Sequence, residues 1–148
     1  MRAHATMSRK IVVASAGMSL DAAWAAMCAR HIRHLPIVEA GRLVGILSDR
    51  DVLLRATRDD DERVIVPGIP VAVAMTPAPY VCSPHAKVSE IARVMIERKI
   101  DAMPVVEGER LVGLVTSTDL LALLVEDDTT QPLPFDFDLE EARAQAVA

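Results

Sequence analysis

The sequence is short of aromatic residues and has no long apolar run, and each shortage narrows what the chain can be. Aromatic residues make up 3% of the 148 residues and hydrophobic residues 51%, so the core must consist of Ala, Val, Leu, Ile and Met. No apolar run approaches the roughly 18 residues that cross a bilayer. We therefore expect a globular chain, with no membrane partner, that forms one domain or two small units sharing a core.

Positive charge is also scarce. The formal net charge is -5 at pH 7 and the pI is about 5.3. Proteins that bind nucleic acid usually carry a basic patch, so this balance argues against nucleic acid as a partner. An anionic ligand would need a local cluster of basic residues.

Cysteine is limited to Cys28 and Cys82, which have no metal-ligand spacing. We expect both to be small buried residues rather than a disulfide, which fits a reducing cytoplasm. The first residues resemble a signal peptide only faintly, and the repeat described next favours a strand at residues 11–14 instead.

The sequence contains an internal repeat. A shift of 68 residues aligns Met7–Leu54 with Met75–Ala122 without a gap. The identical pairs include residues with special backbone or chemical properties, among them Pro36/Pro104, Gly45/Gly113 and Asp51/Asp119. Shared low-complexity composition would not align proline, glycine and aspartate in one register.

Each copy has the pattern of a β-α-β-β-α unit. Apolar residues from Leu20 to Cys28, and again from Val88 to Ile96, recur at helical spacing and predict a helix with one buried face. Two apolar stretches joined by a two-residue turn follow and predict a β-hairpin. We expect a short strand before the helix, at residues 11–14 or 80–82, and a second helix after the hairpin. The predicted fold class is therefore α+β.

We assign residues 1–56 to the first copy, 57–74 to a linker, 75–126 to the second copy and 127–148 to an acidic tail. The linker has a charge run, prolines and a glycine, and its apolar part can return along a sheet edge. The tail has the composition of a partly disordered segment, or of a short helix from Leu139 to Ala146.

Two strings carry a family resemblance. Gly45–Asp51 (GILSDRD) and Gly113–Asp119 (GLVTSTD) match the G-h-x-[S/T]-x-x-D signature of cystathionine-β-synthase (CBS) domains, each after an x-P-h-V strand. The chain resembles a tandem CBS pair, or Bateman module, of the stand-alone bacterial signal-transduction type. The resemblance implies two units packed through their sheets as a pseudo-two-fold pair. It also implies two clefts that in many members bind an adenosine-type ligand.

The motif itself allows two interpretations. A Ser or Thr followed three positions later by Asp is a capping box, which needs no ligand. The same helix N-terminus offers N–H groups to an anion, beside a carboxylate that can hold two ribose hydroxyls. Geometry alone leaves both open, and the resemblance favours the ligand.

For the first cleft the resemblance implies a basic site. Arg33, His34 and Arg50 are expected to meet phosphate, and the first strand to meet adenine, whereas His31 is expected to be solvated at a helix end. The implied set is Val13, Arg33, His34, Leu35, Ser48, Arg50 and Asp51.

The second cleft is expected to bind more weakly. Asp101 stands where the first copy has Arg33, and Thr118 where it has Arg50. This cleft would be empty, take a ligand with little phosphate charge, or borrow a basic group across the cleft. The implied set is Val81, Lys99, Ala102, Met103, Thr116 and Asp119.

We expect no enzyme, because no nucleophile with a base, no metal cluster and no phosphate-binding loop is recognisable. The expected ligand is AMP, ADP or ATP, with S-adenosylmethionine or NAD(H) as alternatives, and no cofactor or metal is expected. Signalling would act in trans on an unknown effector protein. The apolar helix Leu120–Val125 and the alanines between Ala22 and Ala26 favour a homodimer, so a ligand-independent oligomerisation scaffold is the alternative function.

Overall fold

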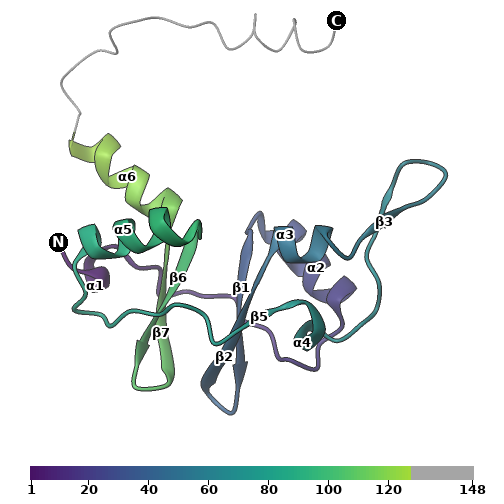
Figure 1. Cartoon of the computed structure of the whole chain (residues 1–148), viewed down its shortest axis with the longest axis horizontal. Helices are drawn as coiled ribbons and strands as arrows, with labels where there is room; N and C mark the ends of the chain where they lie inside the picture. The colour runs from purple at the N-terminus through teal and green to yellow at the C-terminus, as the bar shows by residue number, and fades with distance from the viewer. Residues whose placement is uncertain (128–148) are drawn as a thin grey trace, which may run out of the picture.

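The computed structural model describes residues 1–127, so the predicted tail lies outside the described residues apart from Asp127. Two similar lobes lie side by side, one for each repeat (Figure 1). The helices are α1 (Ala3–Thr6), α2 (Leu20–Arg30), α3 (Asp49–Leu53), α4 (Val71–Ala74), α5 (Val88–Arg98) and α6 (Ser117–Asp127). The strands are β1 (His34–Glu39), β2 (Arg42–Ser48), β3 (Thr57–Arg58), β4 (Val64–Ile65), β5 (Thr76–Pro77), β6 (Ala102–Glu107) and β7 (Arg110–Thr116).

The predicted hairpins are confirmed. β1 pairs with β2, and β6 with β7, in the same antiparallel register with a bulge at the same place in both. Ala40 and Gly41 turn the first hairpin with positive φ angles of 49° and 79°, as a tight two-residue turn requires. The hairpins meet at their tips, where Arg42 pairs with Arg110 in the sheet order β1-β2-β7-β6. The mixed fold of two β-hairpin units is the one predicted.

The long helices bury the predicted faces. Leu20, Ala23 and Met27 of α2 lie in the first core cluster, and Ile91 and Met95 of α5 in the second. No described helix is long and apolar enough to cross a membrane.

The expectation that both cysteines are buried is wrong for Cys28, which is exposed because it lies on the outer side of α2. Cys82 is half-buried, and both thiols are free. Burial raises the pKa of the Cys82 thiol to about 11.

The short strands predicted at residues 11–14 and 80–82, before α2 and α5, do not form; each segment makes only a single β-bridge. Ala14 makes one parallel bridge to Ile37, and Cys82 one to Val105. In the first copy Ala14 donates to the Pro36 carbonyl at 3.1 Å and accepts from the Val38 amide at 2.9 Å. The chain then turns between Ser15 and Met18 into α2, so the pairing ends after one residue.

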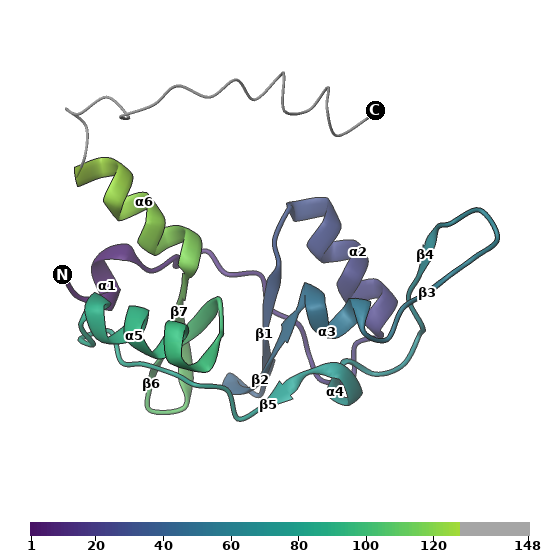
Figure 2. The ribbon, with the colours of Figure 1, turned by 45° about the horizontal axis from the view of Figure 1, so that its top comes forward.

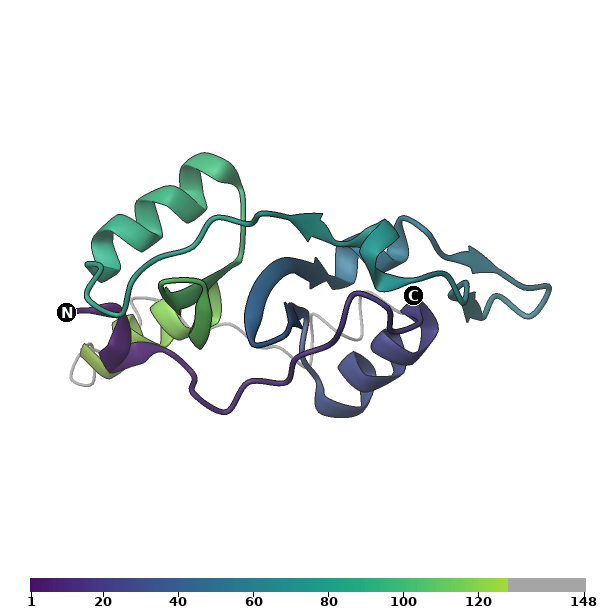
Figure 3. The same ribbon diagram turned by 90° about the horizontal axis from the view of Figure 1, so that it is seen from below.

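The segment leading into each copy packs on the other copy. Ala3 of α1 is fully buried in the second cluster, whereas Val71 and Ala74 of α4 belong to the first. Figure 3 shows the two connecting segments running along opposite sides of the molecule. Because α1 and α4 occupy equivalent positions 68 residues apart, the structural repeat begins earlier than Met7 and Met75.

The linker forms more structure than predicted. Its charge run folds into the β3–β4 hairpin, which projects from the first lobe (Figure 2). Arg58 and Glu62 form an exposed ion pair across it at 2.8 Å. The apolar end of the linker instead forms α4, and the pairing with β2, at Gly45 and Ile46, is made by β5 just after the linker.

Candidate functional site

Both signature motifs form capping boxes. Asp51 N–H donates to Ser48 Oγ at 3.1 Å and Ser48 N–H to Asp51 Oδ2 at 2.8 Å. The corresponding distances at Thr116 and Asp119 are 3.3 Å and 2.8 Å. In each pair the second aspartate oxygen, Oδ1, accepts no hydrogen bond from the described residues. The caps are therefore real, and each leaves one carboxylate oxygen free for another donor.

A cavity of about 280 Å³ lies between the two repeats beside Asp119. Three parts of the chain contribute to it: the crossing N-terminal segment, the turn between α2 and β1, and the end of β7 with the start of α6. Its lining residues are Ser8, Lys10, Ile11, Val12, His31, Ile32, Arg33, His34, Leu114, Thr116, Thr118 and Asp119.

This cavity groups the predicted site residues differently from the sequence analysis. Arg33 and His34 of the first copy line it together with Thr116 and Asp119 of the second. Residues predicted to share the first cleft with Arg33, namely Val13, Leu35, Ser48, Arg50 and Asp51, do not line it. The basic groups are thus shared across the cleft, which is one of the three arrangements expected for the second site.

Several predicted residues lie in the core. Leu35, Met103 and Ala102 are 1%, 2% and 7% exposed, so a ligand could reach little beyond their backbone. Val13 and Val81 are exposed, each beside its single bridging residue. Lys99 caps α5 with left-handed backbone angles.

Ser8, Lys10 and His31 also line the cavity, although they were not among the residues predicted for either site. His31 ends α2 in the left-handed conformation, at φ 53° and ψ 40°, and Lys99 repeats this geometry at φ 54° and ψ 46°. His31 is exposed at the end of α2, as expected from the sequence, and it also lines the cavity. Ser8 and Lys10 reach the second repeat because Ser8 bridges to Leu114, a crossing that periodicity does not reveal.

The charge of the cavity is divided between its two sides. Burial lowers the pKa of His34 below its ordinary value of 6.5, and Arg33 lowers it further, while Asp49, Asp101 and Asp51 partly oppose the shift. His34 is therefore mainly neutral at pH 7, and Lys10 and Arg33 carry the positive charge. Asp119, from the second repeat, supplies a carboxylate to the same cavity.

A family model for the CBS domain matches residues 3–57 and 71–126. The chain belongs to the CBS-domain family. Among solved structures it is similar to the CBS domain pair of protein MJ0100 in complex with 5′-methylthioadenosine and S-adenosyl-L-methionine. That pair is 26% identical with a TM-score of 0.73, and the match covers 86% of this chain and 98% of that one.

Two further CBS-family relatives match most of the chain. The putative acetoin utilization protein AcuB from Vibrio cholerae is 28% identical with a TM-score of 0.73, over 89% of this chain and 98% of that one. The CBS domain-containing protein YhcV from Bacillus subtilis is 28% identical over 115 residues, 78% of this chain and 79% of its own length. Two CBS domains in tandem are thus the organisation of this chain.

Proposed function

We propose that this CBS pair is a non-catalytic regulatory module that binds an adenine nucleotide in the cavity beside Asp119. The observation that carries the proposal is the pairing of Lys10 and Arg33 from the first repeat with Asp119 from the second. This combination suits a nucleotide, because its phosphate binds cationic side chains and its ribose hydroxyls donate hydrogen bonds to a carboxylate.

The rest of the cavity suits the remaining parts of such a ligand. Asp119 Oδ1 would accept from the ribose hydroxyls while Oδ2 keeps its bond to the Thr116 amide. The apolar side chains of Ile11, Val12 and Leu114 would contact the base. The volume of about 280 Å³ lies at the lower end of small-molecule sites, which favours AMP, with the longer phosphates of ADP or ATP extending toward Lys10 and Arg33.

The alternative ligands fit this charge less well. S-adenosylmethionine carries a sulfonium cation, which Lys10 and Arg33 would repel, and NAD(H) is much larger than the cavity. The MJ0100 complex supports an adenosine-type ligand for a pair of this kind. The counterpart cleft at Ser48 and Asp51 becomes the weaker site, the reverse of the ranking expected from the sequence, because Asp101 is the equivalent of Arg33 there.

A thermal-shift panel tests the proposal. AMP, ADP, ATP, NAD(H) and S-adenosylmethionine are compared at equal concentration. A ligand present at about a hundredfold excess over its Kd adds about 2.7 kcal/mol to the free energy of unfolding. The expected result is a rise in Tm with the adenine nucleotides that Asp119→Asn removes. No shift with any of them would overturn the proposal.

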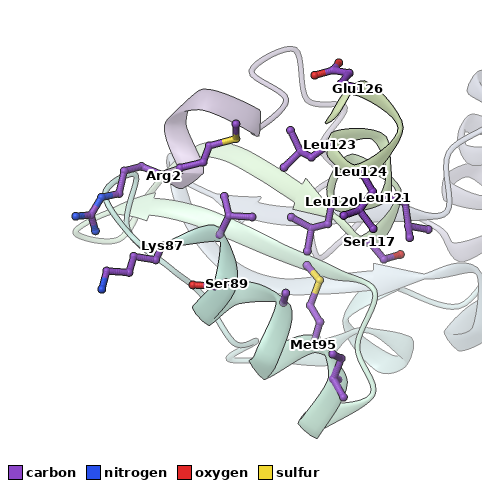
Figure 4. Close-up of a pocket in the computed structure, with 14 residues that line it drawn as sticks. Arg2, Lys87, Ser89, Met95, Ser117, Leu120, Leu121, Leu123, Leu124 and Glu126 are labelled. Atoms are coloured by element: carbon purple, nitrogen blue, oxygen red, sulfur yellow. The ribbon is translucent and has the colours of Figure 1, made fainter. Parts of the chain in front are cut away.

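The alternative function is a ligand-independent oligomerisation scaffold. Leu53, the last residue of α3, and Leu54, its C-cap, are 47% and 76% exposed. The small side chains of Ala22 and Ala25 on the neighbouring α2 would let a second copy pack closely. We propose a homodimer through this face and through the exposed Leu121 and Leu124 of α6 (Figure 4), in the cytoplasm, signalling to an effector protein in trans. Light scattering with and without AMP separates the two functions, since a pure scaffold would dimerise without responding to any nucleotide.

A further inference from the structure

One histidine lies in the nucleotide cavity beside the residues that would bind the phosphate. His34 is the first residue of β1 and follows Arg33 directly, and both line the cavity together with Lys10. β1 lies on the side of the first lobe that faces the second (Figure 2). Its antiparallel pairing sets His34 opposite Ser48, so the sheet fixes the backbone of His34 at the cavity wall.

The ring of His34 is available to a ligand. No hydrogen bond joins it to the residues that the structure describes, and no side-chain nitrogen among them is buried without a partner, so its ring nitrogens are accessible. The cavity holds one other histidine, His31, which is exposed at the end of α2. His4 and His85 lie against each other outside the cavity. His34 is therefore the half-buried histidine of the site.

Charged groups from both repeats surround His34. Burial lowers its pKa below the ordinary value of 6.5, and the Arg33 cation adds to this effect. Three carboxylates oppose the shift: Asp49 and Asp51 of α3, and Asp101 just before β6 of the second repeat. Without a ligand the burial and the cation prevail, so the imidazole is mainly neutral at pH 7.

A bound phosphate would reverse this balance. A phosphate monoester carries close to two negative charges at neutral pH. Placed against Arg33 and Lys10, it would offset the cations that disfavour a charged ring at His34. Asp119, the other carboxylate of the cavity, would act in the same direction. A protonated imidazole donates from both ring nitrogens and a neutral one from a single nitrogen, so the charged ring also binds phosphate oxygens better.

We propose that His34 takes up a proton when the phosphate of the nucleotide enters the cavity, so that the module binds AMP more tightly as the pH falls. This inference rests on the proposed nucleotide site and adds a regulator to it. The protonated ring becomes the third cation of the site, after Lys10 and Arg33. Uptake of one proton can strengthen binding by at most about tenfold for each pH unit. The module would then respond to pH and to nucleotide concentration together.

Isothermal titration calorimetry of AMP tests the proposal. The titration is run at pH 7.2 in HEPES and in Tris, whose ionisation enthalpies differ, and is repeated at pH 8.0. AMP is mainly a dianion at both values, so its own protonation contributes little. The expected result is a binding enthalpy that depends on the buffer, with weaker binding at pH 8.0. Adenosine, which lacks the phosphate, should show neither effect.

Variants assign the proton to its residue. His34→Gln should abolish the buffer dependence and the pH dependence of AMP binding, because glutamine cannot take up a proton. His85→Gln, at an exposed histidine outside the cavity, should retain both. Circular dichroism checks that each variant is folded. Should His34→Gln fail to fold, NMR titration of the imidazole protons in His31→Gln replaces it, and AMP should raise the titration midpoint of one remaining histidine.

Three outcomes would contradict the proposal. Absence of AMP binding at either pH, by heat and by thermal shift, would overturn the proposed function and this inference with it. AMP binding with the same enthalpy in both buffers would overturn the inference alone. Proton uptake that persists in His34→Gln, or histidine midpoints that AMP leaves unchanged, would show that His34 is not the group that takes up the proton.

Discussion

Asp51 and Asp119 make the same cap but have different neighbours. Both accept an amide hydrogen at 2.8 Å through Oδ2, so their structural contributions should be alike. Asp119, however, lines the cavity that contains Lys10 and Arg33. In the equivalent cleft of Asp51, the residue that corresponds to Arg33 is the acidic Asp101. The two aspartates should therefore differ in ligand binding, under the proposed function, rather than in their contribution to stability.

Substituting each aspartate by asparagine separates the two roles. The asparagine oxygen can still accept the amide hydrogen of Ser48 or Thr116, so without ligand the two variants should have nearly the same Tm as each other. A hydrogen bond to a charged group contributes about 1.5–3 kcal/mol, so Asp119→Asn should weaken AMP binding about 10- to 100-fold by calorimetry. Asp51→Asn should weaken it less, the reverse of the ranking expected from the sequence. A larger loss in Asp51→Asn would restore the sequence-based ranking.

His34 should make the ligand-free protein sensitive to acid. Its folded-state pKa lies below 6.5, so the unfolded chain takes up the proton more readily. The free energy of unfolding is therefore fully maintained above pH 6.5 and falls as the pH drops below it. Urea unfolding at pH 7.5 and 5.5 should show a smaller loss in His34→Gln than in the unaltered chain. His85→Gln, at an exposed histidine outside the cavity, serves as the control. If it reduced the loss of unfolding free energy at pH 5.5 as much as His34→Gln does, His34 would not be the group responsible.

At the scale of elements, each segment that leads into one repeat and crosses to the other packs a methionine against a glycine of that other repeat. The pairs are Met7 with Gly113 and Met75 with Gly45. A Cβ on Gly113 would lie 2.8 Å from Met7 Cγ, and one on Gly45 would lie 2.6 Å from Met75 Sδ and 3.0 Å from the Thr76 carbonyl oxygen. Each glycine belongs to one repeat and each methionine to the segment leading into the other. These pairs explain why both residues recur in the repeat.

Gly113→Ala should displace Met7 and, with it, the Ser8–Leu114 bridge. The expected cost is about 1–3 kcal/mol of unfolding free energy, as for other overpacked sites, measured by urea denaturation. Adding Met7→Ala should recover part of it, because the smaller side chain leaves room for the new methyl group. Gly17→Ala, where a Cβ meets nothing within 4 Å, is the matched control. If the double variant were no more stable than Gly113→Ala alone, Met7 would not be the obstacle.

Much of this fold could be predicted because its elements have local signals. The helical stripes of α2 and α5, the turn at Ala40 and Gly41 and the capping boxes depend on residues close in sequence. The packing of α1 and α4 on the opposite repeat has no such local signal. α1, for example, contains a single fully buried residue, Ala3, and no periodic pattern. For the same reason the sequence did not indicate that Lys10 and Asp119 line one cavity.

For the whole molecule, the crossing predicts that both repeats unfold together. Trp24 is the only tryptophan and packs on the first core cluster, so its fluorescence reports on that repeat, whereas far-ultraviolet circular dichroism reports on both. The two probes should give the same urea midpoint, since losing either crossing segment exposes part of the other core. Separate midpoints would show that the repeats unfold independently.

The exchange of leading segments also bears on how such a chain could arise. A half-length chain with one repeat would have a core lacking its α1-like or α4-like helix, and two such chains could supply each other's missing helix by reciprocal exchange. Joining the two halves through residues 57–70 converts that bimolecular assembly into an intramolecular one. The tandem chain then no longer depends on its own concentration to complete either core, and its two halves are free to diverge, as Arg33 and Asp101 have done.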